Sequence, residues 1–202
     1  MKFRKLSLCC FAASLCLMLA AFMLVSEQQK NLSGKVIRFH VLAASDSEED
    51  QRRKLLVRDA LLNVLSQESF QSREEAEAWV TSHLDTLTEE ANRTLLSAGD
   101  DHTARVTLTR ETYPTREYPT FSLPAGEYLS LRAVIGEGAG HNWWCVVYPA
   151  MCMASSQDAM QAQAVSAGFT PDEITLLTGQ TAPIRVRFRL LELLSALRAR
   201  FR

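Results

Sequence analysis

The sequence lacks the glycine-containing motifs that mark many nucleotide-binding and serine-hydrolase sites. Its 202 residues contain neither a phosphate loop of the form GxxxxGK followed by Ser or Thr, nor a GxSxG nucleophile elbow. The glycines at 136, 138 and 140 join two predicted strands and do not lead from a strand into a helix. These absences argue against P-loop phosphate binding and against an activated serine.

Metal-ligating patterns are also missing from the sequence. The four histidines, at 40, 83, 102 and 141, include no closely spaced pair of the kind found in zinc sites. The acidic stretch 46–50 lacks the glycine at the sixth position and the terminal glutamate of an EF-hand loop. We therefore predict no metal and no cofactor.

Charge is absent from residues 6–25, which follow a basic cap of Lys2, Arg4 and Lys5. An apolar run of about 20 residues is long enough to span the hydrocarbon core as a helix. The positive-inside rule keeps the basic cap in the cytoplasm. We predict that residues 1–25 are a signal peptide or an uncleaved membrane anchor, that 26–34 form a tether, and that the rest is exported.

The remaining charges are unevenly distributed. Residues 31–153 carry 12 Lys and Arg against 18 Asp and Glu, a net charge of −6. From residue 154 to the end, 6 arginines face 4 acids, a net of +2. An acidic body is a poor partner for nucleic acid, whose binding depends on neutralising phosphates.

The periodicity of apolar residues predicts an α+β fold in the order β-α-α-β-β-β. Strands are expected at 35–44, 104–112, 128–135 and 143–148, the last being apolar on both faces and hence central. Ser45 with Glu48, and Ser72 with Glu75, predict the starts of helices reaching about 67 and 99. The prolines in 113–124 indicate an irregular connection or an edge hairpin.

These elements predict a mixed or antiparallel sheet of about four strands with two helices on one face. The predicted domain covers 35–153. Residues 154–202 form a C-terminal extension, with a further helix start at Thr170 and a basic amphipathic end from residue 184. That end is expected to pack on the domain, form an edge strand or contact anionic lipid.

Cys145 and Cys152 are the only cysteines outside the N-terminal apolar run. In an exported protein, two such cysteines separated by a Tyr-Pro-Ala bend predict a disulfide. The alternative is a nucleophilic Cys145 with His141 as its base, four residues earlier.

Two surfaces are candidates for binding a partner. Arg38 and His40 share one strand face, and Asp46 and Asp50 follow shortly after that strand. Trp143 and Trp144 point to opposite sides of another strand, so that one can be buried while the other anchors a partner protein.

Two long segments of the sequence resemble the stage II sporulation protein R family. They are IRFHVLAASDSEEDQRRKLLVRDALL, at 37–62, and LPAGEYLSLRAVIGEGAGHNWWCVVYPAMC, at 123–152. The segment PIRVRFRLLELL, at 183–194, is similar to the C-terminal part of that family. The resemblance implies an exported, non-enzymatic signal of endospore formation that acts in the intermembrane space of the sporulation septum.

The implied partner is a membrane-embedded aspartic protease of the mother cell, which cleaves the sigma-E precursor. The positions that match the family motifs and are candidates for partner binding are Arg38, His40, Asp46, Asp50, Arg58, Gly126, Glu127, Trp143 and Trp144. The alternative function is an exported hydrolase that acts on cell wall or peptide through Cys145 or the Arg38/His40/Asp46 face.

Overall fold

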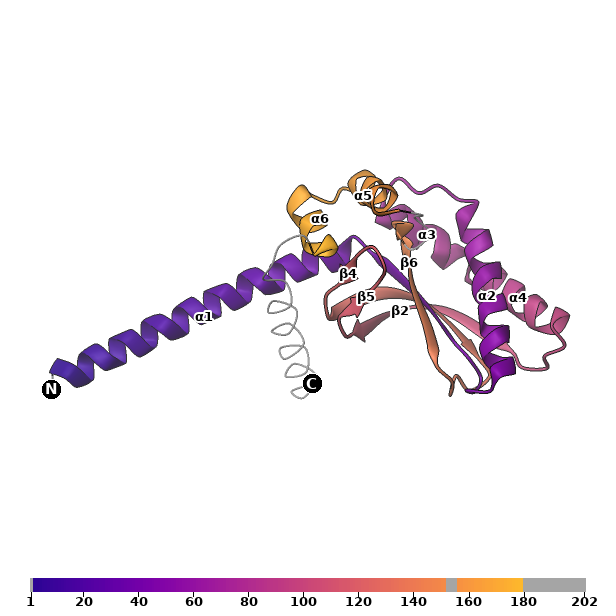
Figure 1. Ribbon diagram of the computed structural model, residues 1–202, viewed down its shortest axis with the longest axis horizontal. Coiled ribbons are helices and arrows are strands. Elements are labelled where there is room, and N and C mark those ends of the chain that lie inside the picture. The colour runs from indigo at the N-terminus through magenta and orange to yellow at the C-terminus, as the bar shows by residue number, and fades with distance from the viewer. Residues whose placement is uncertain (1, 152–155, 180–202) are drawn as a thin grey trace.

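The computed structural model describes residues 2–151 and 156–179. In chain order the elements are α1 (Lys2–Gly34), β1 (Ile37–Leu42), α2 (Glu48–Ser66), α3 (Arg73–Ser82), α4 (Leu84–Ser97), β2 (Ala104–Tyr113), β3 (Arg116–Glu117), β4 (Ser122–Leu123), β5 (Gly126–Ile135), β6 (Asn142–Tyr148), α5 (Gln157–Ser166) and α6 (Pro171–Thr178). Figure 1 shows α1 extending away from the domain that the other elements form.

A mixed four-stranded sheet in the order β2-β5-β1-β6 forms the centre of the domain. β1 pairs with β5 in parallel, whereas the β2–β5 and β1–β6 pairs are antiparallel. The predicted α+β class and the four strands are confirmed. The predicted central position of 143–148 is wrong, because β6 lies at an edge of the sheet.

The helices α2, α3 and α4 cover one face of this sheet (Figure 1). Because side chains alternate along a strand, Phe39 and Val41 of β1 point to this face. They pack there against Leu61 of α2 and Leu87 of α4, and all four are fully buried. This face holds the largest hydrophobic cluster of the domain.

The helix starts follow the predicted chemistry, with one shift in position. Ser72 caps α3 by accepting from the Glu75 amide, as predicted. The cap of α2 is Ser47 and not Ser45, because the Ser47 hydroxyl accepts from the Asp50 amide at 3.1 Å. The single helix expected over 72–99 is divided into α3 and α4 at His83, whose φ of −113° leaves the helical region.

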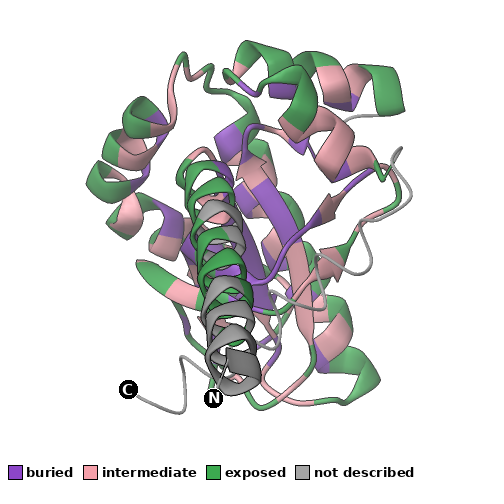
Figure 2. Ribbon diagram, turned by 90° about the vertical axis from the view of Figure 1, so that its left-hand side faces the viewer, coloured by how far each residue is buried: buried purple, intermediate pink, exposed green. Residues whose placement is uncertain are grey.

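Among the residues that the structure describes, other elements cover one end of the opposite face of the sheet. The C-terminal turns of α1, the β3–β4 hairpin, α5 and α6 meet there over β5 and β6. The buried apolar residues of this second cluster are Leu32, Val36, Tyr113, Phe121, Leu123, Tyr128, Val146, Met151, Met160, Ala164, Phe169 and Leu177. Figure 2 shows buried residues concentrated in the strands between these layers.

The N-terminal and C-terminal segments join this second cluster. Residues 26–34, expected as a tether, are helical in α1, and Leu32 is fully buried. Lys35 Nζ lies 2.7 Å from the carboxylate of Glu173 in α6, which begins at the predicted Thr170 cap. Within the described residues, which omit many side chains of α1, no helix combines the length and apolarity needed to cross a membrane.

Two predictions concern positions outside the described residues. These positions are Cys152 and the basic C-terminal end from 184. The Cys145–Cys152 disulfide and the conformation of the basic end therefore stay predictions.

Candidate functional site

Arg38 and His40 lie on the sheet face opposite the three helices α2, α3 and α4. They alternate along β1 with Ile37, Phe39 and Val41, which face those helices. Both are buried, although they are charged or ionisable. A polar and aromatic group surrounds them on this face, and we call it the Arg38–His40 cluster: Arg38, His40, Glu111, Tyr113, Ser130, Arg132 and Trp144.

His40 is held on two sides. Its Nε2 lies 2.8 Å from Oε2 of Glu111 in β2, and its ring stacks on Trp144 of β6 with centroids 4.8 Å apart. Because a carboxylate can only accept, the neutral imidazole carries its proton on Nε2. The Nδ1 atom is then a buried acceptor with no hydrogen-bond partner among the described residues.

Burial controls the ionisation of this cluster. Removal of the His40 imidazole from water lowers its pKa below the ordinary 6.5, and the nearby Glu111 carboxylate opposes this shift only in part. Burial likewise raises the pKa of Tyr113, whose hydroxyl lies 2.5 Å from Ser130 Oγ. Both residues are therefore uncharged at neutral pH.

The cationic side chains of the cluster are of two kinds. Arg38 is fully buried, with its guanidinium carbon 3.8 Å from the centroid of the Tyr113 ring. Arg132 is partly exposed and lies 3.8 Å from Glu111. Arg116 of the β3–β4 hairpin lies outside the cluster, with its guanidinium carbon 4.8 Å from the centroid of the Trp144 ring. A further cation therefore lies beside this tryptophan, where cation–π attraction favours it.

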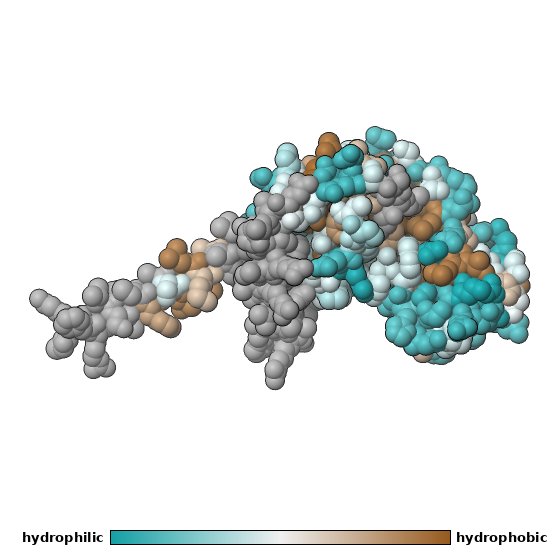
Figure 3. Space-filling view, in the orientation of Figure 1, coloured by the Kyte–Doolittle hydropathy of each residue, from teal (hydrophilic) through white to brown (hydrophobic). Residues whose placement is uncertain are grey.

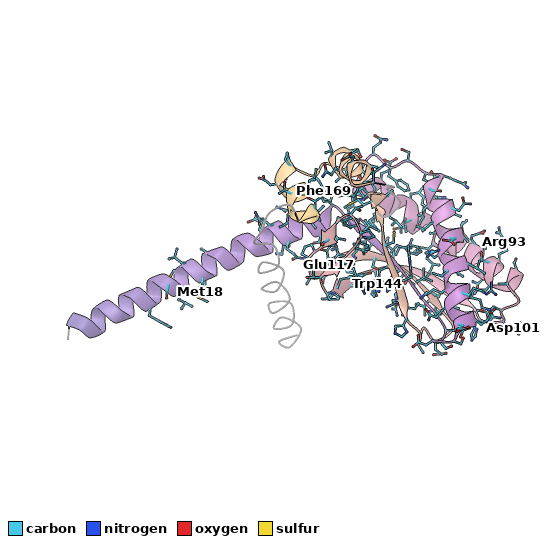
Figure 4. All side chains as sticks on the ribbon, viewed as in Figure 1. Met18, Arg93, Asp101, Glu117, Trp144 and Phe169 are labelled. Atoms are coloured by element: carbon cyan, nitrogen blue, oxygen red, sulfur yellow. The ribbon has the colours of Figure 1, made fainter. Side chains whose placement is uncertain are left out.

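Trp144 is the aromatic member of the cluster that reaches the surface. It is partly exposed and lies edge-on to Tyr113, with ring centroids 5.2 Å apart. Figure 4 shows Trp144 in the middle of the domain, near Glu117 of the β3–β4 hairpin. An aromatic ring with an arginine above it, at the rim of a buried polar cluster, has the composition of a protein-binding hot spot.

The acidic residues at the start of α2 form a separate site. Asp46 accepts from both the backbone amide and the ring Nδ1 of His141, at 2.6 and 2.5 Å. The hydrogen bond from His141 lowers the pKa of Asp46, and the hydrogen bond from Ser45 lowers that of Asp50. Figure 3 shows a mainly hydrophilic surface at this end of the domain. Asp46 thus ties the β5–β6 loop to α2 and does not join Arg38.

Lys54 strengthens the same connection. Its Nζ donates to the His141 carbonyl at 2.9 Å and to Gln51 Oε1, and burial lowers its pKa. Gly140 belongs to this contact as well. A Cβ at this position would lie 2.1 Å from the carbonyl oxygen of Ser45, so only glycine allows the two loops to approach.

The other predicted site residues lie apart from the Arg38–His40 cluster. Trp143 points to the helix face, as predicted from alternation, and the Arg58 guanidinium lies 4.9 Å from its ring. Gly126 begins β5 beside Gln29 of α1, and Glu127 is exposed on the next position. The predicted residues therefore divide between two sheet faces and two ends of the domain.

Sequence reasoning missed Glu111, Tyr113 and Ser130, which complete the cluster. Side chains alternate along β2, and Val106 points toward the helices. Glu111 and Tyr113 lie an odd number of residues from Val106, so the strand pattern places them on the outer face. The strand expected at 104–112 stops one residue before Tyr113, and its apolar alternation identifies only the inward residues. Their pairing with β1 depends on β5, which separates the two strands in the sheet.

One group of side chains in the described residues could hold a cation. Ligand atoms of Asp50, Asp100 and His102 lie within 4.8 Å of one another. Arg53 lies between the two carboxylates, 3.5 Å from Asp50 and 3.6 Å from Asp100. The guanidinium thus already supplies positive charge to these acids.

The pair considered for nucleophilic chemistry is not assembled. Cys145 is buried in the hydrophobic cluster between the sheet and the helices α2, α3 and α4, with 1% of its surface exposed. The His141 side chain is 82% exposed and is bonded to Asp46. Asp46 is likewise not brought to Arg38 and His40, so neither residue set of the hydrolase alternative converges.

Comparison with known proteins gives the family of the chain. Residues 33–158 match the family model described as Stage II sporulation protein R (spore_II_R). The Stage II sporulation protein R of Bacillus subtilis (strain 168) is 33% identical over 133 residues, which cover 64% of this chain and 59% of that relative. The match thus spans less than two thirds of the relative's length, and no solved structure matches the chain. The chain belongs to the stage II sporulation protein R family, a family of sporulation proteins.

Proposed function

We propose that this protein is an exported signal of endospore formation that activates a membrane-embedded aspartic protease of the mother cell. The activated protease then cleaves the sigma-E precursor. The observation that carries this proposal is the family match over residues 33–158. The family name describes a sporulation protein and names no enzymatic activity.

Features of the sequence and structure support export to the septal intermembrane space. The basic cap and the uncharged run at 6–25 have the composition of an export signal or membrane anchor. The α1 helix that contains this run continues to Gly34, and Leu32 near its end is buried in the domain. We propose that the apolar part of α1 enters the membrane and that the domain acts close to that membrane. A membrane-embedded partner is accessible there.

The proposed mechanism is a shift in the equilibrium of the protease. A ligand activates only by binding the active state more tightly than the inactive one. The exposed part of the Arg38–His40 cluster, with Trp144 and Arg116 at its rim, supports a role in that differential binding. Aromatic and arginine side chains dominate the energetics of protein interfaces.

The test is co-expression of the full chain with the protease and the sigma-E precursor in a non-sporulating host. We expect processed sigma-E, detected by immunoblot, only when the exported chain is present. A variant without residues 1–25 should remain inside and give no processing. The same cells without the chain serve as the negative control. Unprocessed precursor in cells that export folded protein refutes the proposal.

A surface variant tests which part of the domain is involved. Trp144→Ala should lose most of the processing, because it removes the aromatic rim of the cluster. Trp79→Ala is the matched control, since this partly buried tryptophan lies on α3, on the other side of the sheet. If both variants are exported and folded and process the precursor equally, Trp144 does not contact the protease.

A further inference from the structure

Arg38 occupies an unusual position for a charged residue. Its side chain is fully buried and lies against the rings of Tyr113 and Tyr128, whose centroids are 3.8 and 5.0 Å from the guanidinium carbon. Arginine stays protonated in proteins. The structure therefore keeps a permanent positive charge away from water.

The hydrogen bonds of this guanidinium are incomplete. Its Nη2 donates to the Tyr118 hydroxyl at 3.0 Å. Its Nε and Nη1 are buried and have no hydrogen-bond acceptor among residues 2–151 and 156–179. A guanidinium carries five N–H donors, and a buried donor without an acceptor destabilises the fold because it has lost its hydrogen bond to water.

The charge of Arg38 is not balanced within its cluster. Glu111 is the one carboxylate there, and its oxygens serve His40, Tyr113 and Arg132. Two guanidinium groups thus face one carboxylate, while His40 is held neutral by burial. The tyrosine rings attract the cation, but a ring cannot accept the in-plane N–H donors of a guanidinium.

A small hairpin separates Arg38 from solvent. The strands β3 and β4 are two residues long and pair through Arg116 with Leu123 and Glu117 with Ser122. Tyr118 lies in the turn between them and is partly exposed. Among the described residues, this side chain supplies the one hydrogen bond recorded for the Arg38 guanidinium, and it also reaches the surface.

We propose that Arg38 is a binding site for a single carboxylate, which enters by displacing the Tyr118 hydroxyl. A carboxylate supplies the missing acceptors and one negative charge, which equals the excess of the cluster. A dianionic phosphate would exceed it. Arg116, over Trp144 at the rim, provides a second cation on the way in. The carboxylate comes from an acidic side chain of the partner protein or from a free small acid.

Binding is measured with acetate as the probe, on the full chain in a non-ionic detergent. Sodium acetate replaces sodium chloride at constant ionic strength, and the Nε–H resonance of Arg38 and the unfolding temperature are followed. We expect a saturable shift of that resonance and a higher unfolding temperature in acetate. Arg38→Gln identifies the resonance and should abolish both effects.

Tyr118→Phe gives a test that does not depend on the folding of an Arg38 variant. It removes the acceptor that competes with the carboxylate, so acetate should bind about tenfold more tightly, which is the value of one charged hydrogen bond. Tyr128→Phe is the matched control, because its hydroxyl donates to the Pro124 carbonyl and leaves Arg38 unaffected. Acetate acting no differently from chloride on the native chain and on Tyr118→Phe overturns the proposal.

The source of the carboxylate is identified in the co-expression assay, and only this arm depends on the proposed function. Each exported-side Asp or Glu of the protease is replaced by Asn or Gln in turn. Loss of processing at one position, combined with acetate binding, assigns the carboxylate to the partner. Acetate binding with no sensitive position assigns it to a free acid. Processing without any acetate binding leaves the proposed function intact and refutes the carboxylate site.

Discussion

Replacing Glu111 with alanine should be among the most damaging single changes on the outer face of the sheet. Glu111 contacts His40 Nε2 at 2.8 Å, the Tyr113 hydroxyl at 3.3 Å and Arg132 at 3.8 Å. Its removal takes the one carboxylate from a cluster that contains the buried Arg38. The expected loss combines unmade hydrogen bonds with an increased excess of buried positive charge.

The size of this effect follows from the burial of the groups involved. Leaving a buried donor without its acceptor costs about 1–3 kcal/mol. Glu111 accepts from the neutral His40 ring and from the Tyr113 hydroxyl, so we expect a loss of about 3 kcal/mol although Glu111 keeps 24% of its side chain exposed. For a chain of this size, that corresponds to a fall of about 6–12 °C in the unfolding temperature. Glu111→Gln retains an acceptor for Tyr113 and should lose only about 1–2 kcal/mol.

The pH dependence of this variant gives a second test. The Glu111 carboxylate raises the pKa of His40, which burial holds below 6.5, so its removal should lower that pKa further. The unfolded chain then takes up a proton at a higher pH than the folded chain does. The free energy of unfolding therefore falls as pH decreases below 6.5, over a wider range in the variant than in the native protein.

The assay is urea denaturation of the full chain at neutral and mildly acidic pH. The control is Glu117→Ala, which removes an exposed glutamate of the nearby hairpin and should change the free energy of unfolding little. Equal unfolding free energies for Glu111→Ala and Glu117→Ala would refute the reasoning, since they would mean that the cluster does not need its carboxylate.

Three further predictions concern stability. In the native chain, the free energy of unfolding should fall as pH drops below 6.5 because the buried His40 has a lowered pKa; His40→Gln should reduce this slope in the same urea titration. Gly140→Ala should lower the unfolding temperature sharply, since its Cβ would lie 2.1 Å from a backbone oxygen, whereas Gly34→Ala meets nothing within 4 Å and should be harmless. Leu61→Ala should cost about 2–5 kcal/mol because the side chain is fully buried, and Leu96→Ala, at 69% exposure, less than about 0.5 kcal/mol; equal denaturation midpoints would contradict this.

Local patterns predicted the elements well because each depends on neighbouring residues. The strand at 104–112 is present as β2 over Ala104–Tyr113, and Ser72 and Thr170 cap α3 and α6. Alternation also placed Trp143 and Trp144 on opposite faces. Where the prediction missed, two local signals competed: Ser45 and Ser47 both precede acidic residues, and only the folded backbone selects Ser47 as the cap.

The order of the strands could not be read from the sequence in the same way. The strand at 143–148 is apolar on both faces, which suggested a central position. It lies at the edge of the sheet, and it is apolar on both faces because the helix α2 covers one face and the second cluster, with Met151 and Met160, covers the other. Burial on both faces reports the layers above and below a strand and not its number of strand neighbours.

The sequence by itself determined the α+β class, the main helix and strand positions and the polar identity of Arg38 and His40. Only the tertiary structure decided what those two residues contact. Glu111 and Tyr113 reach them across β5, from more than 70 positions later in the chain, while Asp46, close in sequence, turns away to His141. Strand pairing brings distant residues together through backbone hydrogen bonds that carry no signature in the side chains. The unbalanced charge of Arg38 among the described residues is therefore a property of the fold, visible only once the sheet is assembled.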